Sequence, residues 1–186
     1  KWPYTYQYLR RFQAELAQRS GLKKYFNVER DAVWSIYNVG THTIAPYKVV
    51  WREQASVLTC ALVSSTSLDG QPEKVVVPDH KLMFVPAESL DEAGFIAALL
   101  GSRIAQLAAK SYALETSTSA HLMEHIAVPA FDPSNQLHRE LAAAAIHLHR
   151  DPSALGSLQG ELDRLAAAVW DLTDKELQAV VQEMEQ

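Results

Sequence analysis

The chain has 186 residues, 48% of them hydrophobic and 21% charged, which fits one sizeable globular domain and excludes a disordered chain. It shows no apolar run as long as a membrane span and no signal peptide, so we expect no membrane partner. The one cysteine, Cys60, cannot form an internal disulfide, which indicates a reducing compartment such as the cytoplasm. Because the chain starts at Lys1 without a methionine, we expect a fragment of a longer protein.

The charges are unevenly distributed along the chain. The net charge of −5 argues weakly against a nucleic-acid partner. Residues 1–52, however, carry nine Lys or Arg against three Asp or Glu, whereas residues 151–186 carry two against eight. A positively charged N-terminal part and an acidic C-terminal part would orient the molecule against a polyanion. Ordinary solvated surface charge explains the same distribution.

The first third of the chain predicts a helix and then paired strands. Leu9, Phe12 and Leu16 recur at helical spacing, which predicts a helix over residues 3–20 that ends at Gly21. Residues 34–52 are the part of the chain richest in aromatic and β-branched residues, and they predict a hairpin or a bent strand pair. We expect the aromatic residues of this stretch to pack in the sheet: Trp34, Tyr37, Tyr47 and Trp51.

The rest of the chain predicts short strands followed by helices. Strands are expected over residues 57–63, 74–77, 81–85 and 126–128. The capping-box pattern Ser-x-x-Glu at Ser89 predicts a helix, which Gly101 weakens midway. Further helices are expected to start at Asp132, Asp151 and Thr173. The predicted fold is α+β, with an N-terminal helix, a small mixed sheet with a packed helix, and a C-terminal helical extension. We expect a domain over residues 1–150 and a helical segment over 151–186.

The chain offers little for catalysis by itself. His121-Leu122-Met123-Glu124-His125 fits the His-x-x-Glu-His pattern of inverted zinc proteases, but loop-like and β-prone neighbours leave room for only about one or two helical turns. Burial as a small hydrophobe is a better interpretation of Cys60 than a nucleophile. His138, His147 and His149 are expected to be solvated or capping. Glycine-rich cofactor loops and an Asn-Pro-Pro-Tyr motif are absent from the sequence.

Four blocks carry a resemblance to one family. They are residues 37–52 (Tyr-Asn-Val-Gly through Val-Val-Trp-Arg), 77–86 (Val-Pro-Asp-His-Lys through Pro), 116–129 (Thr-Ser-Thr-Ser through Val-Pro) and 161–177. Together they resemble the C-terminal specificity region of N6-adenine DNA methyltransferases and type IIG restriction–modification enzymes, which have a TaqI-like specificity domain. Residues 116–129 also resemble the specificity subunits of type I restriction systems.

The resemblance implies that the chain recognises a DNA target and is not itself an enzyme. It implies a parent enzyme that methylates adenine with S-adenosylmethionine, and that uses magnesium if it also cleaves DNA. The expected partners are double-stranded DNA and an upstream methyltransferase domain. Recognition would combine phosphate contacts with the reading of base edges in the major groove.

Candidate DNA-binding residues are the cations and polar side chains of the predicted loops and strand ends. The cations are Lys48, Arg52, Lys74 and Lys81, and the polar readers are Asn38, His80, Thr116, Ser117, Thr118 and Ser119. Two alternatives stay open. The acidic C-terminal helices, with their leucine faces, predict a protein–protein interaction module, and the His121 and His125 pattern predicts a zinc hydrolase.

Overall fold

The computed structural model describes residues 2–27, 29–65, 74–112 and 123–185, and the fold is α+β. The chain forms two compact units, residues 1–41 and 42–186. The boundary therefore lies between Thr41 and His42 and not at Asp151, because the helices that follow Asp151 pack within the second unit. In the described ranges no helix is long and apolar enough to cross a membrane.

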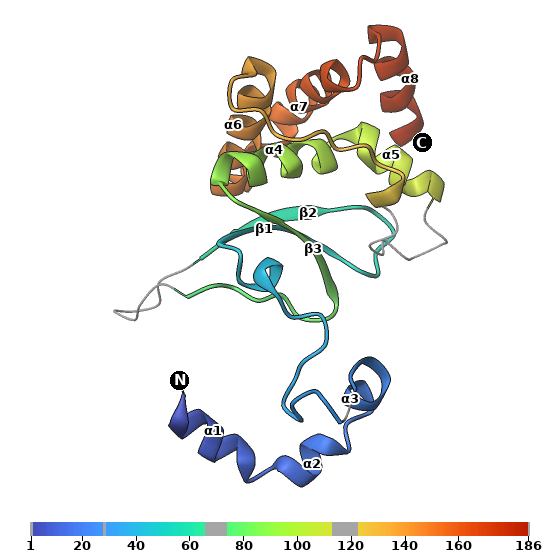
Figure 1. The fold of residues 1–186 in the computed structure, drawn as a ribbon. Helices are drawn as coiled ribbons and strands as arrows, with labels where there is room; N and C mark the ends of the chain where they lie inside the picture. The colour runs from blue at the N-terminus through green and yellow to red at the C-terminus, as the bar shows by residue number, and fades with distance from the viewer. Residues whose placement is uncertain (1, 28, 66–73, 113–122, 186) are drawn as a thin grey trace. The chain divides into compact units, whose positions relative to one another are not determined.

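The described residues of the first unit form short helices (Figure 1). They are α1 (Pro3–Arg10), α2 (Gln13–Ala17) and α3 (Ser20–Tyr25). The predicted continuous helix is wrong, because the backbone leaves helical geometry at Phe12 (φ −108°, ψ 17°) and at Arg19 (φ −57°, ψ 132°). The Arg19 guanidinium donates hydrogen bonds to the carbonyls of Val33 (2.6 Å) and Ser35 (2.8 Å). These long-range hydrogen bonds of Arg19 override the helical pattern of the local sequence.

The second unit is built on a three-stranded antiparallel sheet. Its strands are β1 (Tyr47–Arg52), β2 (Cys60–Ser64) and β3 (Leu82–Ala87), in the order β2-β1-β3. The sheet is antiparallel throughout and not mixed as expected. Pro86 is tolerated in β3 because this strand lies at an edge, where one side needs no donor.

Several expected strand segments take other conformations. Residues 34–46 contain no strand, and a 3₁₀ helix, η1 (Thr41–Ile44), precedes β1. Lys74 forms only an isolated bridge, and residues 126–128 are irregular. The predicted hairpin over residues 34–52 is therefore wrong except for β1. Within this stretch, β1 is the part that helix α4 covers. A strand that is buried on one face needs such a layer to pack against.

Helix α4 (Leu90–Gly101) covers one face of the sheet (Figure 1). The Ser89 hydroxyl accepts a hydrogen bond from the Glu92 amide at 3.1 Å, which confirms the predicted cap. Val49 and Trp51 of β1 belong to the same buried cluster as most of α4. The helix ends at Ser102 (φ −70°, ψ 150°), next to Gly101 as predicted, and α5 (Arg103–Tyr112) follows directly.

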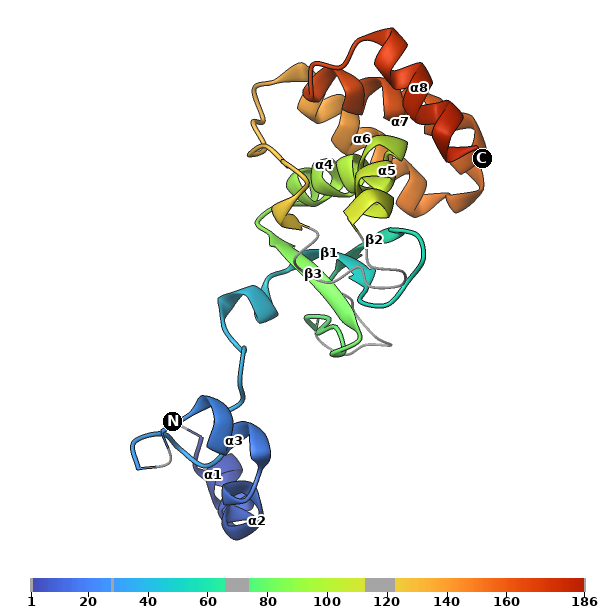
Figure 2. The ribbon, with the colours of Figure 1, turned by 90° about the vertical axis from the view of Figure 1, so that its right-hand side faces the viewer.

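The C-terminal helices form a second layer over α4 (Figure 2). They are α6 (Gln136–Arg150), the 3₁₀ turn η3 (Pro152–Ala154), α7 (Leu155–Val169) and α8 (Asp174–Met184). Helix α6 packs on α4, α7 packs on α6, and α8 packs mainly on α5. A complete capping box between Thr173 and Glu176 starts α8 as predicted, and the bonds from Thr173 lower the pKa of the Glu176 carboxyl.

Helices α4 and α6 approach each other closely at Gly94 of α4. A Cβ atom placed there would lie 2.8 Å from the Ala142 carbonyl oxygen and 3.0 Å from Cγ1 of Ile146, both in α6. Because the nearest obstacle is backbone, a larger side chain forces the two helices apart. The absence of a side chain at Gly94 is thus a requirement of the α4–α6 packing.

A buried carboxylate joins α7 to the start of α5, near the α4–α5 break. Asp163 of α7 is 1% exposed, and its Oδ1 accepts hydrogen bonds from the Arg103 amide (2.8 Å) and from the Gln159 side chain (3.0 Å). Its Oδ2 lies 3.4 Å from Nε of Arg103. The Asp163 carboxylate therefore accepts from an amide at the start of α5 that has no acceptor within the helix, and its negative charge lies next to the guanidinium of Arg103.

Gly94→Ala should lower the free energy of unfolding by about 1–3 kcal/mol, because the new methyl group overpacks the α4–α6 contact. Urea denaturation measures the change. Gly160→Ala, at a helical position with nothing within 4 Å of the new Cβ, is the matched control and should be neutral or stabilising by up to about 1 kcal/mol. Equal stabilities for the two variants would contradict the close packing.

Asp163→Ala should destabilise the fold by about 3 kcal/mol, because it leaves the start of α5 and Arg103 without their buried acceptor. Asp163→Asn keeps an acceptor oxygen and should lose less. Thermal and urea unfolding compare both with Asp174→Ala, an exposed control expected within about 0.5 kcal/mol of the parent. If Asp163→Ala lowered the free energy of unfolding no more than Asp174→Ala does, the carboxylate would be dispensable.

Candidate nucleic-acid interface

Three of the candidate residues meet at one end of the sheet. Arg52 ends β1 opposite Leu82 of β3, and the next amide, that of Glu53, donates to the Lys81 carbonyl at 3.0 Å. Arg52 and Lys81 are both exposed. Since neighbouring positions on a strand alternate between faces, their side chains leave this end of the sheet on opposite faces. A polyanion that lies along the end of the sheet could reach both cations.

A tight turn presents His80 beside them. The Asp79 carboxylate accepts from the Lys81 amide (3.1 Å), and the Leu82 amide donates to the Asp79 carbonyl (2.9 Å). Nδ1 of His80 lies 2.6 Å from the Asp79 carboxylate. This contact fixes one ring nitrogen of His80 and leaves the other edge of the imidazole to contact a ligand.

Lys48 lies inside the protein. Its side chain is 1% exposed, and its ammonium donates a 2.6 Å hydrogen bond to the Ala45 carbonyl. Desolvation lowers the pKa of this lysine. The structure therefore removes Lys48 from the surface that DNA can reach. The apolar neighbours Val49 and Val50 were the sequence signal for this burial.

The remaining candidates are Asn38, Lys74 and residues 116–119. Asn38 belongs to the first unit, where it has a left-handed backbone with φ 56°. Lys74 is exposed on the segment that precedes β3. The Thr-Ser run, residues 116–119, lies outside the described residues.

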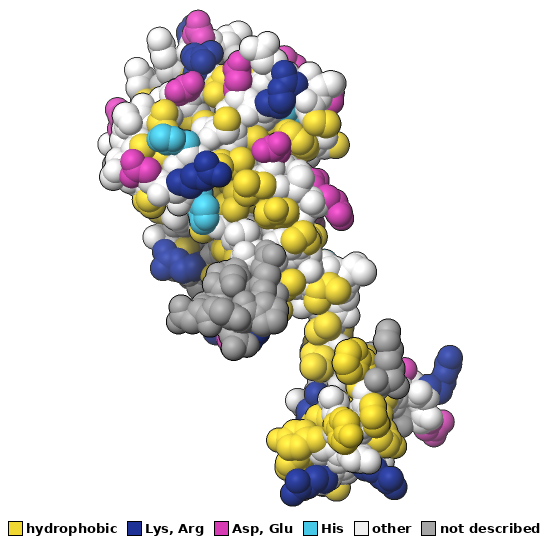
Figure 3. Space-filling view, turned by 90° about the vertical axis from the view of Figure 1, so that its left-hand side faces the viewer, with side chains coloured by type: hydrophobic (Ala, Val, Ile, Leu, Met, Phe, Trp, Pro, Cys, Tyr) yellow, Lys and Arg dark blue, Asp and Glu magenta, His cyan; other side chains and the backbone are white. Residues whose placement is uncertain are grey.

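The first unit contains a group of exposed aromatic residues that the list of candidates missed. In Figure 3, hydrophobic side chains cover much of the visible face of this unit, and Lys or Arg side chains border them. Its exposed large hydrophobic residues are Trp2, Tyr4, Tyr6, Tyr8, Phe12, Tyr25, Ile36, Tyr37 and Val39. The run from Lys23 to Phe26 was the available signal. The expected sheet packing holds for Trp51, which is buried, but not for Tyr37, which is exposed.

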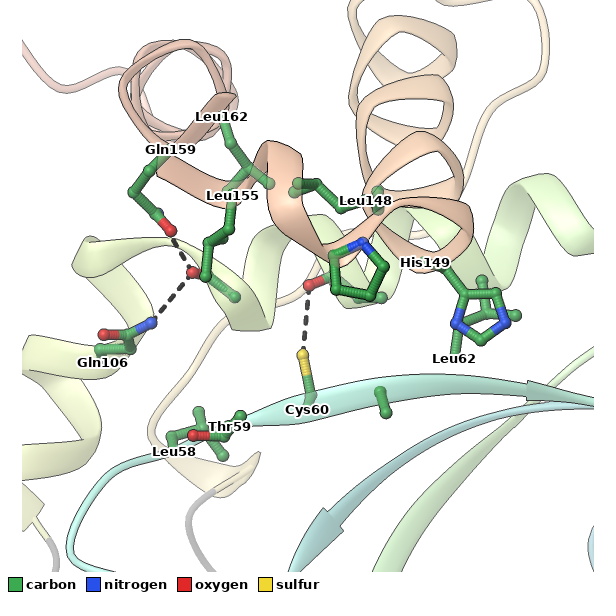
Figure 4. A pocket seen from close by; sticks show the side chains of 15 residues that line it. Leu58, Thr59, Cys60, Leu62, Gln106, Leu148, His149, Leu155, Gln159 and Leu162 are labelled. Atoms are coloured by element: carbon green, nitrogen blue, oxygen red, sulfur yellow. Dashed lines mark hydrogen bonds between the residues drawn. The ribbon is translucent and has the colours of Figure 1, made fainter. Parts of the chain in front are cut away.

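A pocket of about 360 Å³ lies between β2, α4, α6 and α7 (Figure 4). Its lining is mostly apolar, and the polar groups in its wall are largely bonded to the protein. The Gly101 carbonyl accepts from the amides of Gln106 (3.0 Å) and Gln159 (3.3 Å), and the Cys60 thiol donates to the Ala97 carbonyl at 3.3 Å. Burial raises the pKa of the Cys60 thiol to about 12, so this cysteine is not an activated nucleophile.

His125 and His138 take structural positions. His125 stacks on Tyr112 with ring centroids 4.2 Å apart, and His121 lies outside the described residues. His138, expected to be solvated or capping, is buried against Phe95, and its Nδ1 accepts from the Asp132 amide at 3.0 Å. Within the described ranges no three His, Cys, Asp or Glu side chains are grouped closely enough to hold a metal ion.

Cys60 in the folded protein should react with iodoacetamide at pH 8 at least about a hundredfold more slowly than in urea, because its thiolate is scarce and its sulfur is partly covered. Mass spectrometry of the alkylated protein over time measures the rate. Fast labelling of the native protein, at the rate of the unfolded control, would contradict the assigned environment.

No protein-family model matches this chain, and no curated protein matches its sequence.

Proposed function

We propose that this chain is the target-recognition part of a site-specific DNA adenine N6-methyltransferase and that it binds double-stranded DNA. The observation that carries the proposal is the display of three exposed candidates, Arg52, Lys81 and His80, at one end of the sheet. Two cations at the same end of the sheet suit phosphates on a duplex, and phosphate contacts fix the register of the protein on DNA. The four sequence blocks and their order add support.

The proposed mechanism divides the work between this chain and an upstream domain. The upstream domain would hold S-adenosylmethionine and flip the target adenine out of the duplex. The residues of this chain would hold the duplex by its phosphates, and the polar side chains of the loops would read base edges in the major groove. Neither the Cys60 thiol nor the buried His138 takes part in this scheme, because both are engaged inside the protein.

The alternative of a helical interaction module has less support. The apolar face of α8 was expected to dock on a partner, but its side chains are already half-buried in a helix that packs on α5 and α7. These side chains are Leu177, Val180, Val181 and Met184. Their packing within the second unit leaves the cations at the end of the sheet as the better-supported contact surface.

Binding to a duplex oligonucleotide should weaken steeply with salt, since phosphate contacts release counterions. Arg52→Gln and Lys81→Gln should each lower the affinity and reduce the slope of log K against log salt by about 1. Lys175→Gln, an exposed cation on α8, is the control and should leave the slope unchanged. Fluorescence anisotropy at a series of salt concentrations gives all four slopes.

The outcome that would overturn the proposal is no duplex binding by the parent chain even at about 50 mM salt, where electrostatic DNA binding is strong. Equal slopes for all three variants and the parent would instead place the phosphate contacts elsewhere on the chain.

A further inference from the structure

The first unit contains a stack of two tyrosines and a lysine. The rings of Tyr25 and Tyr37 lie 3.8 Å apart between centroids with an interplanar angle of 18°. The ammonium of Lys24 lies 4.9 Å from the centre of the Tyr25 ring. Tyr25 is 45% exposed and Tyr37 is 56% exposed, so the stack lies at the surface of the unit and not in a core.

The backbone beside the stack also favours a binding role. Asn38, directly after Tyr37, adopts the left-handed conformation, which turns the chain after the stack. Ile36 and Val39, on either side, are 66% and 57% exposed. A left-handed turn that holds several apolar side chains in solvent is typical of a contact surface and not of a folding nucleus.

The charge around the stack favours a nucleic acid over a protein as its partner. Lys23 and Lys24 occupy the last turn of α3, and both are exposed. A hydrogen bond with Tyr25 raises the pKa of Lys24, so its ammonium stays charged at neutral pH. Protein–protein interfaces are depleted in lysine, whereas surfaces that bind single-stranded nucleic acids combine cations with exposed aromatic rings.

We propose that Tyr37, supported by Tyr25 and Lys24, is a stacking platform for an unpaired nucleobase. The base would lie on the Tyr37 ring, and the lysines of α3 would contact the neighbouring phosphates. The base must be unpaired because in a duplex both faces of each base are covered by its neighbours. This inference rests on the proposed DNA-binding function and adds a single-stranded or locally opened segment as the ligand of the first unit.

The test compares binding of a labelled oligothymidylate single strand, measured by fluorescence anisotropy at low salt. Tyr37→Leu removes the aromatic face and should weaken binding about five- to a hundredfold. Tyr37→Phe keeps the face and should bind within about twofold of the parent chain, because stacking needs the ring and not the hydroxyl. Tyr4→Leu is the matched control, since Tyr4 is 85% exposed in the same unit and should not change the affinity.

A second measurement identifies the contact directly. Photocrosslinking of a strand that carries iodouracil should attach the base to the peptide that contains Tyr37, and Tyr37→Leu should abolish this product. Crosslinks confined to the second unit would overturn the assignment.

The remaining outcomes separate the inference from the function on which it rests. If the parent chain binds duplex DNA and Tyr37→Leu does not change single-strand affinity, the stacking site is wrong and the proposed function stands. Equal losses in Tyr37→Leu and Tyr37→Phe would exclude stacking in the same way. If neither DNA form binds, the proposed function and the stacking site both fail.

Discussion

The second unit depends on the carboxylate of Asp163. Two helices that follow each other with a single residue between them would leave the first amides of α5 buried without partners. Asp163 supplies the acceptor from α7, and Ser102 adds its own hydroxyl, which accepts from the Ala105 amide at 3.3 Å. The chain can therefore turn sharply after α4, so that α4 lies across the sheet while α5 receives α8. The Asp163 carboxylate thus supports the sharp break between α4 and α5.

This arrangement determines which cations are buried and which are exposed. Strand β1 is held between two neighbours and covered by α4, so its central residues are committed to packing. Lys48 lies in that central part, and its ammonium is used to hold the turn before β1. Arg52, four positions later, lies where the buried part of the strand ends. A basic residue is therefore structural within the strand, whereas a basic residue at its end is exposed.

The sequence predicted those features that depend on neighbouring residues. The caps at Ser89 and Thr173 and the break after Gly101 follow from local hydrogen bonding and backbone freedom. The helix over residues 3–20 failed because Arg19 bonds carbonyls far along the chain. The hairpin over residues 34–52 failed because aromatic and β-branched composition marks both strands and exposed contact surfaces. Composition alone does not show which aromatic residues a helix layer will cover.

The two units differ in what stabilises them. The second has a continuous core, whereas Leu22 is the one buried residue among the described residues of the first. Its helices of 8, 5 and 6 residues are shorter than isolated helices that persist in water. Ring contacts and the hydrogen bonds of Arg19 connect its segments. A ligand that stacks on Tyr37 would stabilise the first unit, which has little core of its own. Part of the binding free energy would then be offset by the cost of ordering this unit. Mutations that loosen the first unit would then weaken DNA binding without touching DNA.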